Sequence, residues 1–308
     1  MDEKTIRNIF NEYVADLDAK YWPLTPNWIG IDELFLVRKP RCIFTNVQQR
    51  TIMDLLPNRD QASVLKWLMR RQLRELVEVV TMDMWRPYRN AALEAMPNAV
   101  VVVDKFHVVK MANHALDSIR KGLRDGMDLK ERRKLLRSRH LILRRRKDLS
   151  DKDYAAMEEW TNAIPALFAA YQAKEDFFDI YECKSKVEAM ELYDTWKACL
   201  DKRTAAAFFE LIRAVDNWRP EIFNYFDFPG ATNAYTEAAN GMAKVANRLG
   251  RGYSFEAIRA KVLFGQAKHI KRPKFGETAL ESADTYGVSL PSLIEMLDAN
   301  HSDTLNSE

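Results

Sequence analysis

The sequence predicts an α/β fold in which a mixed five-stranded sheet with helices is interrupted by a long all-α insertion. Segments rich in β-branched and aromatic residues are confined to residues 27–103. Helical patterns fill residues 106–225, and two more follow a break at residues 226–233. The length of 308 residues exceeds that of a usual single core, which fits a core with an insertion.

The strand signals form two groups that predict the sheet topology. Residues 27–38, 41–48 and 50–56 predict three strands joined by short turns, which must be antiparallel. Residues 75–82 and 99–103 predict two more strands. Each of these is reached through a helix, so we expect both to lie parallel in the same sheet.

Helix signals separate and follow these strands. Residues 4–20 predict a short amphipathic helix. Asp60 is placed to cap a helix, and Pro87 begins another that reaches about Met96. The expected organisation has five parts: an N-terminal helix in residues 1–24, the first part of the core in 25–110, the insertion in 111–230, two core helices (about 232–248 and 254–270) in 231–272, and an acidic tail in 273–308.

Composition excludes several classes of protein. No apolar run is long enough to span a bilayer, and the acidic start is unlike a signal peptide, so we expect a cytoplasmic protein. The three cysteines are far apart without a C-x-x-C pair, which excludes a zinc ribbon. The net charge is +3, but residues 120–147 and 244–274 are strongly basic. Such clusters suit a phosphate backbone, although a solvated helix face explains the first cluster equally well.

Three acidic residues stand out by position. Asp32 lies within the first strand, Asp83 ends the fourth, and Glu237 lies on a helix. The first and fourth strands are expected to be neighbours, so their acids can converge, and a helix on the same edge can bring the third. Three such carboxylates can hold two Mg²⁺ ions roughly 3.5–4 Å apart, the arrangement used for in-line phosphoryl displacement. Mn²⁺ can substitute for Mg²⁺.

Each acid also has a structural explanation. Asp32 could be an exposed strand residue, yet its apolar neighbours make an unpaired charge costly there. Asp83 could cap the helix at Pro87, and Asp104 could cap the helix that starts at Phe106. Glu237 could face solvent.

The helix around Glu237 has a patterned surface that favours a functional role. One stripe carries an acid at one end and cations at the other, and consists of Asn233, Glu237, Asn240, Lys244 and Arg248. Such a stripe suits a metal-binding end and a DNA-phosphate end. A second stripe of the helix is apolar and consists of Tyr235, Ala238, Met242, Val245 and Leu249.

Several blocks together resemble the DDE transposases of the ISL3 group of bacterial insertion sequences. These blocks, in order, are "GIDELFLVRK", "TMDMWRPYRNAALEAMPNAVVVVDKFHVVKMANHALDSIRK", "KLLRSRHLILRRRKDLS" and "TNAYTEAANGMAKVANRLGRGYSFEAIRAKVLF". The resemblance covers about residues 25–270. It implies an RNase H-like core with an all-α insertion that cuts and joins DNA strands at transposon ends with Mg²⁺.

Carried over by position, the resemblance makes Asp32 the first catalytic acid and metal ligand and Glu237 the third. The fold argument favours Asp83 as the second, while Asp104 and His107 form a D-x-x-H element that is similar to one following the second acid in related transposases. Asp104 is the alternative second acid; otherwise it and His107 order the edge of the site or contact DNA. The DNA-binding residues are expected to be Lys244, Arg248, Arg251, Arg132, Arg133, Arg144 and Arg145.

The sequence departs from the family at its N-terminus. Such transposases usually carry a cysteine-rich zinc module and helix-turn-helix segments, whereas 31 residues without cysteine precede Asp32 here. The first helix is therefore expected to be a remnant of the helix-turn-helix region. Besides an active transposase, the alternatives are a truncated, non-catalytic DNA-binding remnant or an inhibitor of a full-length transposase, and an RNase H-like nuclease without a joining step. We expect DNA as partner, a homo-oligomeric active complex and association with the bacterial nucleoid.

Overall fold

The computed structural model describes residues 2–137 and 139–265, which form two compact units. Unit 1 contains residues 2–102 and 231–265, and unit 2 contains residues 103–230. The expected acidic tail and the end of the helix predicted at 254–270 lie outside the described residues. No helix in the described part of the chain is long and apolar enough to cross a membrane.

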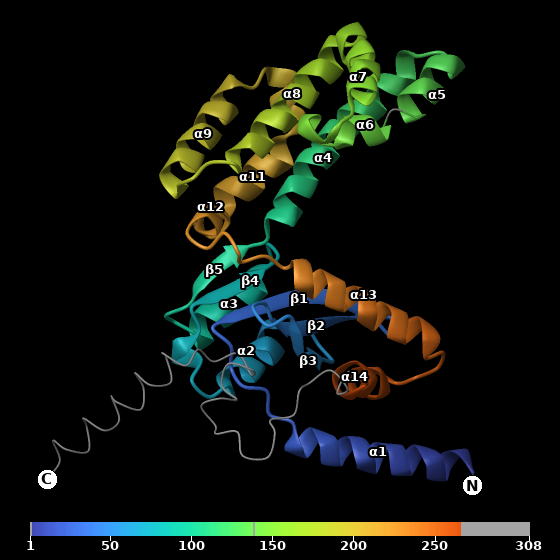
Figure 1. The fold of residues 1–308 in the computed structure, drawn as a ribbon, viewed down its shortest axis with the longest axis vertical. Coiled ribbons are helices and arrows are strands. Elements are labelled where there is room, and N and C mark those ends of the chain that lie inside the picture. The colour runs from blue at the N-terminus through green and yellow to red at the C-terminus, as the bar shows by residue number, and fades with distance from the viewer. Residues whose placement is uncertain (1, 138, 266–308) are drawn as a thin grey trace, which may run out of the picture. The chain divides into compact units, whose positions relative to one another are not determined.

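Unit 1 is built on a five-stranded sheet with the strand order β3-β2-β1-β4-β5 (Figure 1). The strands are β1 (Trp28–Leu36), β2 (Lys39–Asn46), β3 (Thr51–Leu56), β4 (Val79–Met82) and β5 (Val100–Val103). β2 pairs antiparallel with β1 and β3, and β4 pairs parallel with β1. The N–H of Val100 donates to the carbonyl of Glu78 at 2.8 Å, so the first residues of β4 and β5 lie next to each other. The predicted mixed α/β sheet is confirmed.

The turn between β1 and β2 sets the register of the first hairpin. Leu36 pairs with Lys39, so only Val37 and Arg38 connect the strands. Both have left-handed φ angles, 49° and 58°. A two-residue loop with two positive φ values matches the right-handed twist of paired strands, which is why two bulky residues are held in this conformation.

The fourth strand is shorter than the pattern of residues 75–82 predicts. A 3₁₀ turn, η1 (Arg74–Leu76), occupies the beginning of that segment, after Leu73 with a φ of 54°. The amide of Val77 donates to the carbonyl of Arg74 and is therefore used within the turn. Pairing with β1 begins only at Val79, opposite Trp28.

Strand alternation separates two hydrophobic cores on the two faces of the sheet. Ile29 and Ile31 pack with α2 (Gln61–Met69) and α3 (Arg86–Ala95). Leu34 and Leu36 pack instead with α13 (Ala234–Leu249) and α14 (Phe255–Phe264). Burying each such side chain stabilises the fold by about 1.5–3 kcal/mol. The even-numbered residues of β1 therefore face α13.

The N-terminal helix α1 (Glu3–Lys20) has no buried residue. Its C-terminal end is joined to unit 1 by polar contacts. Arg259 on α14 bonds Asp18 at 2.7 Å and Asp54 at 2.8 Å, and the hydroxyl of Tyr21 donates to the carbonyl of Met53 at 3.0 Å. Contacts at one end therefore attach this helix.

After Val103, the last residue of β5, the described residues of unit 2 form helices and their connections, as the patterns in residues 106–225 predict. Its α-helices are α4 (Lys105–Gly122), α5 (Leu129–Arg137), α6 (Arg139–Leu143), α7 (Asp151–Ala163), α8 (Pro165–Ile180), α9 (Lys186–Cys199), α10 (Lys202–Ala207), α11 (Phe209–Asn217) and α12 (Arg219–Phe223). Short 3₁₀ turns η2 (Leu123–Gly126), η3 (Arg146–Asp148) and η4 (Asn224–Phe226) connect some of them. The boundary expected at residue 111 falls within α4, which packs on α8 and α11 of the same unit.

Candidate active site

Asp32 lies near the middle of β1 and faces α13. It pairs across the sheet with Ile43, between Gly30 and Leu34 on the same face. Its side chain is nearly completely buried, with 5% of the residue exposed. The amide of Glu33 donates to Oδ1 of Asp32 at 2.6 Å. The carboxylate is thus held against its own strand.

Asp83 directly follows Met82, the last residue of β4. Ile31 of β1 is paired with Met82 of β4, and the two strands are parallel. Asp32 follows the first of these residues and Asp83 follows the second. Thr81, two residues before Asp83, points its hydroxyl to α13. Alternation therefore directs Asp83, which is half-buried, to the same face as Asp32.

A buried polar network attaches the start of α13 to the sheet. Asn233, at the N-cap position and fully buried, donates from Nδ2 to the carbonyl of Ile31 at 3.2 Å. Its Oδ1 accepts from the hydroxyl of Thr81 at 2.5 Å. The hydroxyls of Thr236 and Thr45 are 2.7 Å apart. These bonds connect the helix to β1, β2 and β4, so its first turn has a defined position on the sheet.

Gly30 permits this close approach. A Cβ added at Gly30 would lie 2.6 Å from Oγ1 of Thr236 and nearer still to Oγ1 of Thr45. Real Cβ atoms do not approach other atoms so closely. The absence of a side chain at this position of β1 lets the helix contact the strand backbone.

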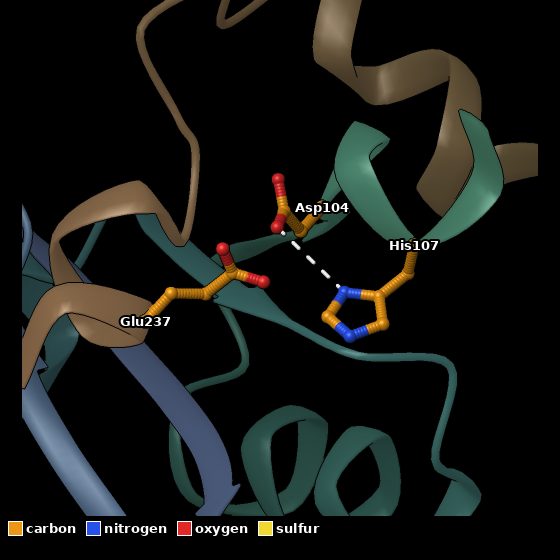
Figure 2. Close-up of side chains that lie close together, drawn as sticks. All are labelled: Asp104, His107 and Glu237. Atoms are coloured by element: carbon orange, nitrogen blue, oxygen red, sulfur yellow. Dashed lines mark ion pairs between the residues drawn. The ribbon is translucent and has the colours of Figure 1, made fainter. Parts of the chain in front are cut away.

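Glu237 lies on the first turn of α13 (Figure 2). Asn240 donates from Nδ2 to Oδ2 of Asp32 at 2.6 Å. Residues three apart on a helix share a face, so Glu237 and Asn240 project from the same side of α13. The N-terminal position also suits a carboxylate, because the helix dipole is positive there.

The apolar stripe of α13 is not the face that packs on the sheet. The buried residues of the helix are Thr236, Ala239, Asn240 and Ala243. Four residues of this stripe are exposed, namely Ala238, Met242, Val245 and Leu249. Small side chains face the sheet because the helix lies so close to it, and large apolar residues would not fit.

Asp32, Asp83 and Glu237 therefore share one face of the sheet in unit 1. Among the described residues, the oxygens of these three side chains do not all lie within 4.8 Å of one another, as the ligands of a single ion would. The structure links Asp32 with the helix of Glu237 through Asn240, and with Asp83 through strand pairing. An all-oxygen donor set suits a hard divalent cation such as Mg²⁺ or Mn²⁺.

Asp104 and His107 stand at the start of α4 in unit 2 (Figure 2). Asp104 is buried and caps the helix, since the amide of Phe106 lies 3.4 Å from its Oδ1. Nδ1 of His107 is 3.7 Å from Oδ2 of Asp104, close enough for an ion pair if the imidazole is protonated. The chain places Asp104 immediately after β5. The cap accounts for Asp104 structurally, as the sequence allows, and its role as an alternative acid stays a prediction.

The predicted DNA-binding cations differ in their surroundings. Lys244, Arg248 and Arg251 are exposed on or just after α13, and no ion pair involving them is found in the described part of the chain. Arg133 is exposed and Arg132 half-buried on α5. The remaining two are paired with acids.

Arg145 has the most extensive ion pairs of these residues. It lies 3.4 Å from Glu175, 2.5 Å from Asp179 and 3.2 Å from Glu182, with 18% of its side chain exposed. Arg144 contacts Asp153 at 3.8 Å. Part of the basic cluster of residues 120–147 is therefore balanced within unit 2.

Some residues that build the site carry no clear sequence signal. Gly30, Thr45, Thr81 and Thr236 are common residue types, and only the alternation of β1, β2 and β4 could have placed three of them on the face of Asp32. Asn233 and Asn240 were visible on the stripe of Glu237. Their bonds to the sheet required the packing of α13 to be known.

Comparison with known proteins identifies relatives of the chain. The family model DDE_Tnp_ISL3, described as "Transposase", matches residues 29–262. Two curated relatives from Mycobacterium tuberculosis strains CDC 1551 / Oshkosh and ATCC 25618 / H37Rv are each described as "Transposase for insertion sequence element IS1557". Each is 23% identical over 269 residues, or 78% of this chain. The chain spans 60% of the length of either relative in this match.

Proposed function

Because the chain belongs to the ISL3 group of DDE transposases, we propose that it catalyses metal-dependent cleavage and joining of DNA strands at insertion-sequence ends. The observation that carries the proposal is the 2.6 Å hydrogen bond between Asn240 and Asp32. It connects β1 with the helix of Glu237 and so supports assigning these two acids, far apart in sequence, to one site. Asp83 joins them from the neighbouring strand.

The three carboxylates of unit 1 have one role in this proposal, which is to hold divalent cations. Asp32, Asp83 and Glu237 offer only oxygen atoms, the donors that Mg²⁺ and Mn²⁺ prefer. Two bound ions would activate a water or 3′-hydroxyl and stabilise the leaving oxygen. Asp104 at the end of β5 is the alternative to Asp83, and His107 would then orient the Asp104 carboxylate.

The exposed cations would bind the DNA backbone. Lys244, Arg248 and Arg251 continue from the acidic end of α13 to its C-terminus and beyond, so a phosphate chain could follow the helix away from the carboxylates. Arg132 and Arg133 on α5 are further candidates. Arg144 and Arg145 contribute less in this proposal, because acids of unit 2 already balance them.

The proposal extends to the state in which the protein acts. Joining a transposon to its target requires both transposon ends to be held together, which a homo-oligomer would do. We place this complex on nucleoid DNA in the bacterial cytoplasm.

The test is a nicking and joining assay on duplexes carrying the ends of the element, with Mg²⁺, Mn²⁺ or chelator. Asp32→Asn and Glu237→Gln should abolish both products, because each removes a carboxylate without changing side-chain size. Glu256→Gln is the matched control, since Glu256 also lies in the first turn of a helix, α14, and is exposed. The control should keep wild-type activity.

Three outcomes would change the proposal. Cleavage that persists in Asp32→Asn and Glu237→Gln would refute the assignment of these acids. Salt-sensitive DNA binding without cleavage by wild type would favour a non-catalytic binder or inhibitor. Cleavage without joined product would favour a nuclease.

A further inference from the structure

We infer that Asn240 is a positioning residue for Asp32: its side-chain amide fixes the orientation of the Asp32 carboxylate for cation binding. The inference rests on the proposed function, because it concerns the same carboxylate and the same cations. Asn240 itself is not among the proposed metal ligands.

The hydrogen bonds around Asp32 fix both oxygens of its carboxylate. Oδ1 accepts from the amide of Glu33 at 2.6 Å, and Oδ2 accepts from Nδ2 of Asn240 at 2.6 Å. A carboxylate can accept about four hydrogen bonds or metal contacts. These two donors, one to each oxygen, limit rotation of the group and fix the directions in which its lone pairs point.

The orientation of the Asn240 amide follows from its two neighbours. Nδ2 lies 2.6 Å from Oδ2 of Asp32 and 3.4 Å from the carbonyl oxygen of Glu33, and both partners are acceptors. With its oxygen and nitrogen exchanged, the amide would place an oxygen against two oxygens. The NH₂ group must therefore face β1. It contacts both the Asp32 carboxylate and the neighbouring backbone carbonyl of Glu33.

A neutral donor is suited to this task. A lysine or arginine at position 240 would also hold Asp32, but its positive charge would compete with a metal cation for the carboxylate. The asparagine amide fixes the group and leaves its negative charge for the cation. Asn240 is 5% exposed, so water does not compete strongly for these bonds.

The remaining oxygen of the asparagine adds a second argument. Among the described residues, Oδ1 of Asn240 is buried and accepts no hydrogen bond. A buried acceptor of this kind usually receives a hydrogen bond from protein or water. Divalent cations keep part of their water shell in protein sites. A water carried by a cation bound at Asp32 would supply such a donor to Oδ1.

A purely structural role for Asn240 is the competing explanation. The amide could serve only to attach α13 to β1. However, Asn233 and Thr236 already attach the first turn of the helix by hydrogen bonds, and Ala239 and Ala243 pack against the sheet. The experiment must therefore separate attachment of the helix from orientation of the carboxylate.

The experiment measures Mn²⁺ affinity of the full-length protein by electron paramagnetic resonance, with circular dichroism confirming the fold. Asn240→Ala and Asn240→Leu remove the donor, and leucine keeps most of the side-chain volume. Each should weaken Mn²⁺ binding about 10–100-fold, the usual effect of losing a residue that orients a ligand. Thr236→Val is the matched control, because it breaks a bond of α13 that does not touch Asp32. It should lower the melting temperature but change Mn²⁺ affinity less than about twofold.

The outcomes separate this inference from the proposed function. If Asp32→Asn loses Mn²⁺ while both Asn240 variants bind it like wild type, the inference is wrong and the proposed function stands. Equal weakening in Thr236→Val and Asn240→Leu would show that helix attachment matters instead, and would also overturn the inference. If wild type shows no Asp32-dependent Mn²⁺ binding, both fall.

Discussion

Gly30 of β1 and Thr236 of α13 approach so closely that a Cβ on the glycine would lie 2.6 Å from the threonine hydroxyl oxygen. They are about 200 residues apart in sequence, with the whole of unit 2 between them. This contact determines how near α13 lies to the strand that carries Asp32. The position of the helix that carries Glu237 therefore depends on residues that are not among the proposed metal ligands.

Gly30→Ala should destabilise unit 1, because the new methyl group overlaps the hydroxyls of Thr45 and Thr236. Overpacking of this kind costs about 1–3 kcal/mol. Urea denaturation measures the change. Gly241→Ala is the control, because it lies on the exposed side of the same helix with no atom within 4 Å of an added Cβ. It should be neutral or stabilise by up to about 1 kcal/mol, and an equal loss in both variants would contradict the overlap.

Thr81→Val should also destabilise unit 1 while preserving side-chain shape. The hydroxyl of Thr81 is fully buried and donates at 2.5 Å to Oδ1 of Asn233. Valine removes this donor, and the next donor, Thr236, is 3.4 Å away. A buried acceptor that loses its partner costs about 1–3 kcal/mol. Thr195→Val on the exposed surface of α9 should change the free energy of unfolding by less than about 0.5 kcal/mol.

Lys244→Ala should weaken DNA binding, whereas Arg145→Ala should lower the stability of unit 2. Lys244 is exposed, so its loss should weaken DNA binding and reduce the slope of log K against log salt by about 1. Arg145 is engaged by three acids, so its loss should leave the slope unchanged and destabilise unit 2. Fluorescence anisotropy at several salt concentrations, with thermal denaturation, measures both. A lower slope in Arg145→Ala would show that its charge is available to DNA.

Asp117→Asn should destabilise unit 2 at neutral pH. Asp117 lies 2.8 Å from Arg120, 3.1 Å from Lys121 and 3.2 Å from Arg139. Arg120 is almost completely buried. Removing one partner of a buried ion pair costs about 3–5 kcal/mol. Urea unfolding at pH 7 measures the loss. Asp153→Asn breaks an exposed pair with Arg144 and should cost less than about 1 kcal/mol.

The same residue should make stability depend on pH. Burial alone would raise the pKa of Asp117, but hydrogen bonds from Arg120, Lys121 and Arg139 outweigh it and lower the pKa to about 2. The folded pKa is thus below the ordinary value of 3.8. The stabilisation is fully present above about pH 4 and is lost as the pH falls toward 2. The difference in unfolding free energy between wild type and Asp117→Asn should shrink over that interval, and a constant difference would contradict this assignment.

Much of unit 1 follows from local patterns in the sequence. The strands of residues 27–56, the capped helix after Asp60 and the fifth strand all occur close to their expected positions, because periodicity and turn residues agree there. The fourth strand was predicted too long because Leu73 adopts a left-handed φ, which nothing in its side chain favours.

The candidate site was predictable only in part. Strand alternation predicts that Asp32 and Asp83 face the same side of the sheet, and the pairing of β1 with β4 confirms that the two strands are neighbours. The buried face of α13 was not predictable from hydrophobicity, because the sheet accepts Thr236 and Asn240 and leaves Met242 and Val245 exposed. Which face of α13 is buried depends on Gly30, which lies on a strand far away in sequence. The sequence pattern of the helix alone does not include this residue.

The anchoring of Asn233 has a consequence for how this architecture tolerates change. Asn233 lies three positions after Gly230, the last residue of unit 2, and is itself bonded to Ile31 and Thr81. Lengthening, shortening or replacing the inserted helices would thus leave unchanged the place where the chain re-enters unit 1, at Asn233. We therefore expect grafting of other helices in place of unit 2 to leave Glu237, four residues after Asn233, at the same position on the sheet.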